Sequence, residues 1–310
     1  MPKLSIIIPC YYNEENIPVT SKRLLENEAN FPADVSFEYV MIDDGSKDGT
    51  YEAIKAFQAA NPGKVVLVKL ASNFGSYNAI LAGMEQASGD CNTVISCDLQ
   101  DPPELIAKMY AHWSSGIKLV IANRQDREDD FPSSLFSKFF HSLTRRLALK
   151  SLPKGGFDFV LFDRALKDEV VRMKEKNTNT LFLLLWLGYD FVTIPYKRAK
   201  REVGKSRWTF SKKLKLFIDS FVAFSFFPIR LISVVGLLLG CVSLLYGIYI
   251  LISKLMGGIE VQGWTSMMVV FLFVSSFQTI ALGIIGEYVW RTLDASRKRP
   301  VFIVEEVKRA

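Results

Sequence analysis

The sequence predicts an α/β domain followed by two membrane-spanning helices. Short apolar, β-branched runs alternate with helical stretches over roughly the first 200 residues, which is typical of an α/β sheet domain. Beyond Arg230 the chain has two long stretches without a charged residue. With 310 residues and 49% apolar content, the chain is long enough for one full domain and a membrane segment.

Each predicted strand is a short apolar run, and the first, Leu4–Pro9, ends at a proline. Such runs read as buried parallel strands. The others are Phe37–Ile42, Val65–Leu70, Thr93–Cys97, Leu119–Ala122, Asp158–Asp163 and Phe191–Arg198. Helices are predicted at Glu15–Glu28, Gly49–Ala60, Ser76–Ala87, Pro103–Trp113, Ala165–Lys174 and Asn179–Leu187. The alternation predicts a doubly wound parallel sheet with ligands at the carboxyl ends of its strands.

The apolar stretches Leu231–Ser253 and Val261–Gly286 each exceed the roughly 20 residues that cross a bilayer core. We therefore predict transmembrane helices at 229–254 and 263–290. The alternative, two buried core helices, is disfavoured because such helices rarely run this long without a charge. The short connection makes the pair a hairpin.

Basic residues flank the outer ends of this hairpin, whereas the loop between the helices offers only Lys254. The positive-inside rule then places the α/β domain and the tail 291–310 in the cytoplasm. Met1–Pro9 lacks the pattern of a signal peptide. A net charge of +6, concentrated beside the spans, suits anionic lipid headgroups better than nucleic acid.

Segment 206–228 is predicted to be an amphipathic juxtamembrane helix. Its apolar residues recur at steps of three and four along one helical face, as at Phe217, Phe221 and Phe224. A basic, aromatic helix just before a span is expected to lie in the membrane interface. The alternative is a helix packed on the α/β domain.

The first acidic motif, Asp43-Asp44-Gly45-Ser46, follows the second predicted strand. Its carboxylates can accept hydrogen bonds from a base N–H or from ribose hydroxyls. The alternative is a plain turn, with Asp48 capping the next helix.

The second acidic motif, Ser96 to Glu104, follows the fourth strand. Asp98 and Gln100 are candidate ligands of Mg²⁺ or Mn²⁺, which proteins bind through one or two carboxylates plus substrate phosphates. Asp101 is expected only to cap the helix that begins at Pro102-Pro103. The four cysteines show no metal-ligand spacing, and a cytoplasmic domain keeps them reduced.

Taken together, these motifs resemble glycosyltransferase family 2, and most closely its polyisoprenyl-phosphate glycosyltransferases, relatives of dolichol-phosphate mannose synthase. The resemblance covers nearly the whole chain. It rests on Asp43–Ser46, on the Asp-Leu-Gln-Asp-Pro-Pro-Glu run from Asp98 and on the two spans. Further matching segments are Asn123–Arg127, Asp158–Arg164, Arg201–Trp208, Gly286–Arg291 and Arg299–Pro300.

The resemblance implies a GT-A, Rossmann-like nucleotide-sugar-binding domain over 1–205. It implies inverting transfer of a hexose from a nucleotide diphosphate sugar to a polyprenyl phosphate, assisted by Mg²⁺ or Mn²⁺. Asp98 and Asp158 are the implied catalytic residues, with the role of Asp158 open between sugar contact, acceptor orientation and general base. The implied nucleotide-sugar-binding residues are Pro9, Tyr11, Asn13, Glu14, Asp43, Asp44, Ser46 and Asp98. Those for the acceptor phosphate are Arg124, Arg127, Lys205 and Arg207.

Two departures from the family pattern matter. Ser96 stands where the family has the first Asp of Asp-x-Asp, so a metal would depend on Asp98, Gln100 and substrate oxygens. The Asn-Glu pair after Pro9 is displaced by one residue, which leaves open whether Asn13, Glu14 or Glu15 faces the nucleotide.

UDP-glucose is the favoured donor and undecaprenyl phosphate in a bacterial inner membrane the favoured acceptor, with other nucleotide hexoses open. The family resemblance also implies a homo-oligomer, with a tetramer among the possible states and the strand-like tail Val301–Val304 pairing with a neighbouring subunit. Glu287 and Arg291 are expected to form an i,i+4 ion pair. The alternatives are a non-catalytic, membrane-anchored nucleotide-sugar-binding subunit and a processive polysaccharide synthase.

Overall fold

The computed structural model describes residues 1–98, 100–124, 145–146, 149, 151–153, 156–198, 218–219, 221–256 and 263–309. The chain divides into two compact units. The first is Met1–Ala223 together with Pro300–Ala310, and the second is Phe224–Arg299.

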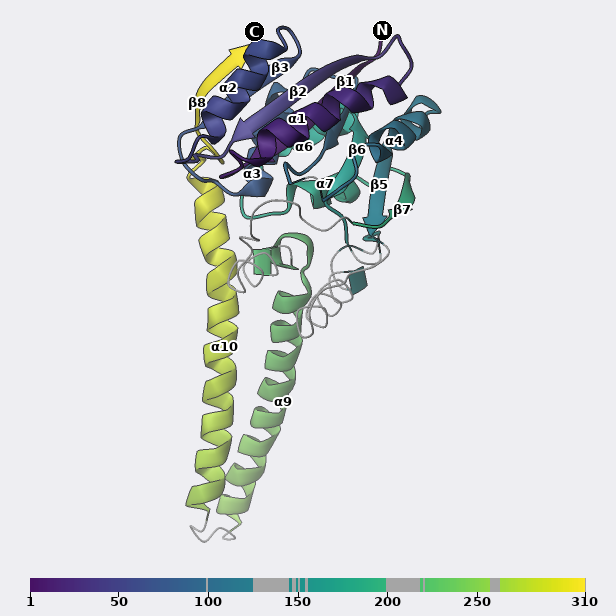
Figure 1. Ribbon diagram of the computed structural model, residues 1–310. Coiled ribbons are helices and arrows are strands. Elements are labelled where there is room, and N and C mark those ends of the chain that lie inside the picture. The colour runs from purple at the N-terminus through teal and green to yellow at the C-terminus, as the bar shows by residue number, and fades with distance from the viewer. Residues whose placement is uncertain are drawn as a thin grey trace. The chain divides into compact units, whose positions relative to one another are not determined.

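The first unit is built on an eight-stranded mixed sheet in the order β7-β5-β6-β4-β1-β2-β3-β8 (Figure 1). Its strands are β1 (Lys3–Cys10), β2 (Ser36–Asp43), β3 (Val65–Leu70), β4 (Cys91–Val94), β5 (Leu119–Arg124), β6 (Phe159–Asp163), β7 (Phe191–Tyr196) and β8 (Val304–Arg309). The predicted α/β alternation is confirmed. The prediction of a wholly parallel sheet is wrong, because β6 and β8 run antiparallel to their neighbours.

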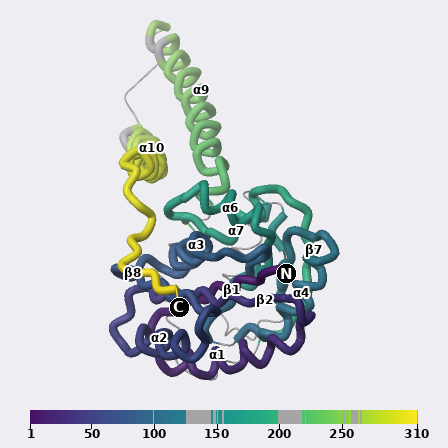
Figure 2. The backbone as a smooth tube through the Cα atoms, turned by 90° about the horizontal axis from the view of Figure 1, so that it is seen from above, coloured from purple at the N-terminus to yellow at the C-terminus, as the bar shows by residue number. Residues whose placement is uncertain are grey.

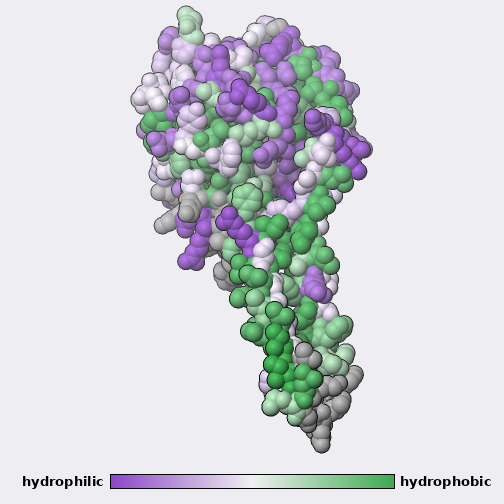
Figure 3. Space-filling model, turned by 180° about the vertical axis from the view of Figure 1, so that it is seen from behind, coloured by the Kyte–Doolittle hydropathy of each residue, from purple (hydrophilic) through white to green (hydrophobic). Residues whose placement is uncertain are grey.

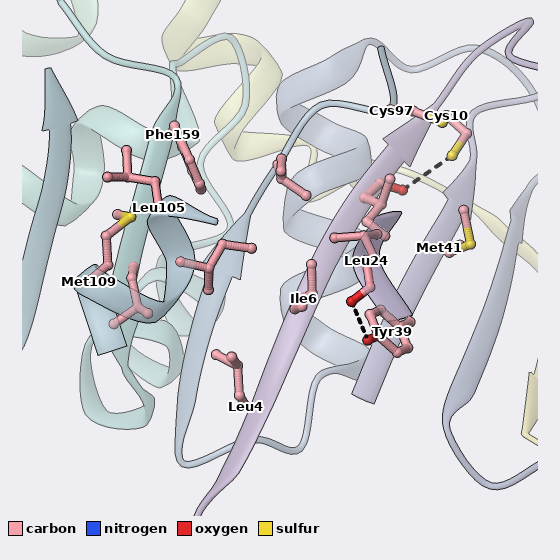
Figure 4. Close-up of a cluster of buried hydrophobic side chains, with 14 of the residues drawn as sticks. Leu4, Ile6, Cys10, Leu24, Tyr39, Met41, Cys97, Leu105, Met109 and Phe159 are labelled. Atoms are coloured by element: carbon pink, nitrogen blue, oxygen red, sulfur yellow. Dashed lines mark hydrogen bonds between the residues drawn. The ribbon is translucent and has the colours of Figure 1, made fainter. Parts of the chain in front are cut away.

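Helices cover both faces of this sheet (Figure 2). They are α1 (Asn16–Asn27), α2 (Thr50–Ala60), α3 (Ser76–Gln86), α4 (Leu105–Ser114), α6 (Arg164–Met173) and α7 (Thr180–Trp186), with a 3₁₀ turn, η1, at Glu28–Asn30. Alternate residues of a strand point to opposite faces. Accordingly, Ile6 and Ile8 pack with Leu24 and Met109, from α1 and α4 (Figure 4). Ile7 lies on the other face, against α3 at Gly83.

The strand directions bring six carboxyl ends to one edge of the sheet. Strands β1 to β4 are parallel to one another, and β5 and β7 share their direction because β5 and β4 both pair antiparallel with β6. The residue before β6 and the start of β8 lie at that same edge. In such sheets ligands bind at the carboxyl ends of the strands.

The second unit contains two long helices, α9 (Phe227–Leu255) and α10 (Trp264–Ser296). Each is long and apolar enough to cross a membrane. The rest of the protein buries almost none of their apolar segments, whose side chains lie on the surface (Figure 3). A core helix of a soluble protein would be mostly buried, so the alternative of two core helices is not supported. The predicted ion pair is confirmed, since Arg291 Nη2 lies 2.8 Å from Glu287 Oε1. Most of the predicted juxtamembrane helix 206–228 lies outside the described residues.

The tail forms its strand later than expected, as β8, and within this chain. It pairs antiparallel with β3, with Val68 opposite Val307. Pairing of the tail with a neighbouring subunit stays a prediction. The exposed backbone of edge strand β3 is covered by the same chain.

A buried carboxylate, Glu38 of β2, stabilises the end of the sheet at which the parallel strands begin. Its side chain accepts hydrogen bonds from Lys3 Nζ at 2.9 Å, from Ser5 Oγ at 2.5 Å, and from the Ser88 amide and hydroxyl, each at 2.8 Å. Burial alone would raise the pKa of Glu38, but these donors more than offset it and lower the pKa.

We predict that Glu38→Gln lowers the free energy of unfolding by about 2–3 kcal/mol at neutral pH, since buried donors lose a charged acceptor. Because the pKa in the folded state is depressed, this difference should be present above pH 4.5 and shrink as the pH falls below it. Urea unfolding at several pH values measures it. Glu26→Gln, at an exposed site, is the control; equal losses in both variants would contradict the prediction.

Candidate active site

The turn after β2 is tied to the loop after β1. Ser46 N donates to Asp43 Oδ1 at 3.0 Å, and Tyr12 N donates to Ser46 Oγ at 3.0 Å. Asp43 is fully buried, and its Oδ2 is buried without a hydrogen-bond partner. Burial raises the pKa of Asp43, although the bonds from Ser46 oppose that effect. An unpartnered buried carboxylate oxygen is costly, so it marks a candidate position for a ligand donor.

The side chains of Asn13 and Glu14 accept hydrogen bonds from backbone amides near the site. Asn13 Oδ1 accepts the Tyr11 amide at 2.8 Å, and Glu14 Oε2 accepts the Gly49 amide at 2.9 Å, just before α2. Pro9 lies in β1 opposite Ile42. These contacts place all the predicted nucleotide-binding residues of the first loop at the carboxyl-end edge. Their contact with a nucleotide stays a prediction.

Asp44 anchors a third loop, the one between β3 and α3. Its carboxylate accepts the Phe74 amide at 2.7 Å, the Gly75 amide at 3.0 Å and Asn73 Nδ2 at 3.1 Å. Burial raises the pKa of Asp44 to about 6, although the two amides lower it. Gly45, with φ +68°, allows this approach, since a Cβ there would meet the Ser72 carbonyl carbon at 2.5 Å.

Asp98 lies just after β4 and is half-buried. Its Oδ1 accepts from the Ser96 hydroxyl and from the Gln100 amide, the latter at 3.3 Å. Within the described ranges, no group of three His, Cys, Asp or Glu side chains is placed to hold a metal ion. The donor set of Asp98, Gln100 and Ser96 fits a magnesium-type ion only if substrate phosphates supply further ligands.

A chain of polar side chains links two strands, β5 and β7, with the segments before β6 and after β4. The Arg124 guanidinium, at the end of β5, pairs through Nη2 with Asp158 Oδ2 and donates from Nε to Tyr196 Oη at 3.2 Å. Tyr196 in turn donates to Asp101 Oδ1 at 2.5 Å. The Arg124 side chain is 8% exposed and that of Asp158 51%. Asp158 therefore faces solvent, with the arginine behind it.

This chain of side chains stabilises the charge of a buried arginine. Burial alone would lower the pKa of Arg124, but Asp158, with smaller contributions from Tyr196 and Asp101, raises it above the usual value. Burial raises the pKa of Asp101, while the charges of Arg198 and Arg124 oppose that rise.

Asp101 does not have the role that the sequence suggested. Helix α4 begins at Leu105, its N-cap residue is Glu104, and no side chain caps it. The Asp101 carboxylate instead faces Tyr196 and Arg198 Nε, the latter at 3.4 Å. The prediction of a cap was wrong because it considered only neighbours in sequence. Asp48 is not the N-cap residue of α2, which is Gly49, although its Oδ1 accepts the amide of Thr50, the first residue of the helix, at 3.2 Å.

Three predicted acceptor-binding residues, Arg127, Lys205 and Arg207, lie outside the described residues. Sequence reasoning also missed Tyr196 and Asn73. The signal available for Tyr196 was its place near the end of the predicted strand Phe191–Arg198, at the edge of the sheet where ligands bind.

Comparisons with known proteins show the family to which the chain belongs. Residues 5–172 match the model of the family described as glycosyl transferase family 2. The chain belongs to glycosyltransferase family 2. It is 34% identical to the bactoprenol glucosyl transferase of Shigella phage SfV, over 99% of each chain. It is 32% identical to a prophage bactoprenol glucosyl transferase homolog of Escherichia coli K12, over 99% of this chain and 100% of that one.

Among solved structures, the chain is similar to a mannosyltransferase from Pyrobaculum calidifontis at 18% identity. That match has a TM-score of 0.45 and covers 66% of this chain and 58% of the other. Family membership makes the protein a glycosyltransferase enzyme, and the expected GT-A domain followed by two apolar helices is confirmed.

We predict that Tyr196→Phe lowers kcat/KM for sugar transfer about tenfold. The ring can still pack edge-on against Phe159, but Arg124 and Asp101 lose their shared partner. One bond to a charged group is worth about 1.5 kcal/mol, which corresponds to roughly tenfold in rate. Steady-state kinetics measure it. Tyr189→Phe, at an exposed ring, is the control, and equal kcat/KM in both variants would contradict the prediction.

Proposed function

We propose that this enzyme transfers glucose from UDP-glucose to undecaprenyl phosphate at the cytoplasmic face of a bacterial inner membrane, with inversion at the anomeric carbon. The observation that carries the proposal is the placement of Asp43, Asp98 and the Arg124–Asp158 pair at one sheet edge, in a chain with two long apolar helices. Two relatives of nearly equal length are named bactoprenol glucosyl transferases, and bactoprenol is a polyprenol.

The acceptor chemistry suits this residue set. A phosphate monoester has its second pKa near 6, so at neutral pH it is largely a dianion and already a nucleophile. Its oxygen attacks the anomeric carbon as the bond to the diphosphate breaks, which gives the polyprenyl-phosphate sugar and UDP. The main demands on the protein are therefore alignment and charge compensation rather than proton removal.

Arg124 and Asp158 divide that work in the proposal. The Arg124 guanidinium supplies positive charge where two anions meet. Its low exposure to solvent strengthens its electrostatic attraction to them. Asp158, at the solvent side, orients the guanidinium and lies within reach of an incoming substrate. Arg127, Lys205 and Arg207 remain our predicted contacts to the acceptor phosphate.

The nucleotide is proposed to lie over the loops at Asp43 and Asp44. Asp43 Oδ2, buried and unpartnered, is placed to accept a hydrogen bond from the base or ribose. Pro9, Tyr11, Asn13, Glu14 and Ser46 shape the same edge. Asp98 and Gln100 would hold Mg²⁺ or Mn²⁺, which when bound neutralises charge on the leaving diphosphate.

We predict that the purified protein, given undecaprenyl phosphate and Mg²⁺ or Mn²⁺, moves label from UDP-glucose into an organic phase. Separate incubations with UDP-galactose, UDP-N-acetylglucosamine and GDP-mannose should give little. Excess chelator should stop transfer, and added metal should restore it. Scintillation counting of the extracted lipid measures each arm.

Asp98→Asn tests the site in the same assay. Its transfer should fall at least about 100-fold, because the diphosphate loses its metal-binding carboxylate. Asp168→Asn, at an exposed position of α6, is the matched control. Transfer from another donor would contradict the choice of glucose. Nucleotide binding without transfer from any donor would contradict the proposed reaction.

A further inference from the structure

We propose that β8 is a positioning element of the nucleotide-sugar site, because it holds the loop at 71–75 in the conformation that anchors Asp44. The inference rests on the proposed function only where it assigns Asp44 to that site. β8 lies at the edge of the sheet beside β3 (Figure 1).

The backbone of β8 reaches the loop itself. Pairing with β3 runs from Arg309, opposite Val66, to Val304, opposite Leu70. One further bond follows, from the Ala71 amide to the Ile303 carbonyl at 3.0 Å. Three residues later the loop donates its Phe74 and Gly75 amides to Asp44. The chain is therefore held on both sides of Ser72 and Asn73.

One face of β8 is attached to α2. Glu306 Oε2 accepts from Tyr51 Oη at 2.5 Å, and Lys308 Nζ donates to the same hydroxyl at 2.9 Å. Gln58 Nε2 bridges the carbonyls of Val65 and Lys308, at 3.0 and 2.8 Å. Helix α2 begins four residues after Ser46. Through α2, this face of β8 is therefore connected to the turn that carries Asp43 and Asp44.

The other face of β8 is attached to β3 and α3. Glu305 Oε1 accepts from Lys69 Nζ at 2.9 Å, and the Arg309 guanidinium donates to the Gln86 carbonyl at 3.1 Å. Lys69 is two residues from Ala71, and α3 begins directly after Gly75. β8 thus contacts α2 and α3, which both begin at the site. It also contacts β3, which leads into the loop at 71–75.

Removing β8 would break these contacts but leave the main hydrophobic core packed. β3 would become an edge strand with unpaired backbone groups, and edge segments open locally at low free-energy cost. The loop at 71–75 would then lose the hydrogen bond that the Ala71 amide donates. The Phe74 and Gly75 amides that donate to Asp44 would become less ordered. Nucleotide affinity should therefore weaken while the catalytic groups at Asp98 and Arg124 stay in place.

The test uses two variants of the full-length protein in detergent or bilayers. Glu305→Gln/Glu306→Gln removes both carboxylates that fasten β8. A chain that ends at Phe302 removes the strand together with the Ile303 carbonyl that accepts the Ala71 amide, so the result does not depend on how far two charge changes loosen β8. Glu26→Gln/Glu169→Gln, at exposed helical ion pairs, is the control with the same charge change.

Hydrogen exchange at the Phe74 and Gly75 amides should become at least about fivefold faster in both β8 variants. Exchange at Met41 and Ile42 in central β2 should not change, which shows that the sheet remains folded. The KM for the nucleotide sugar should rise about fivefold, with kcat and the KM for the lipid acceptor within about twofold of the parent.

Unchanged exchange at Phe74 and Gly75 in the chain without β8 would overturn the proposal. So would faster loop exchange with an unchanged KM for the nucleotide sugar. The exchange measurement needs no substrate. If the parent protein transferred no sugar from any donor, the proposed function would fail while the effect of β8 on the loop would still be decided.

Discussion

The ion pair between Arg124 and Asp158 is the interaction on which the rest of the site depends. Arg124 is almost fully enclosed, and a buried guanidinium without a carboxylate beside it would be strongly destabilising. Tyr196 links the pair to Asp101, so a single polar chain joins β5, β7 and the segments before β6 and after β4. A charge held in place before substrate arrives needs little reorganisation during the reaction.

The other half of the site is ordered by carboxylates that bind backbone rather than substrate. Asp44 uses both oxygens to hold the loop at 73–75, and Glu14 holds the start of α2. Asp43 keeps one buried oxygen without a partner. Adjacent residues of one motif thus have different tasks. Asp44 holds the neighbouring loop, and Asp43 is the member of the pair with an oxygen left for a ligand.

Local pattern was enough to predict most strands and helices, because each apolar run has to bury itself in the sheet. It failed where the deciding contact is distant. Asp101 looks like a helix cap, but its partner Tyr196 is 95 residues further along the chain. The reversed directions of β6 and β8 have no local signature either. Arg124 and Asp158 were found only through their resemblance to family segments, since nothing near either residue indicates the pairing.

A double-mutant cycle of Tyr196→Phe and Asp158→Asn tests the central claim most directly. If both residues act through Arg124, their effects on kcat/KM should be coupled by about 1–2 kcal/mol, because the second substitution disturbs an arginine already released by the first. The cycle uses the same labelled transfer to lipid for all four proteins. Effects that add to within about 0.5 kcal/mol would contradict the account, since they would show two independent sites.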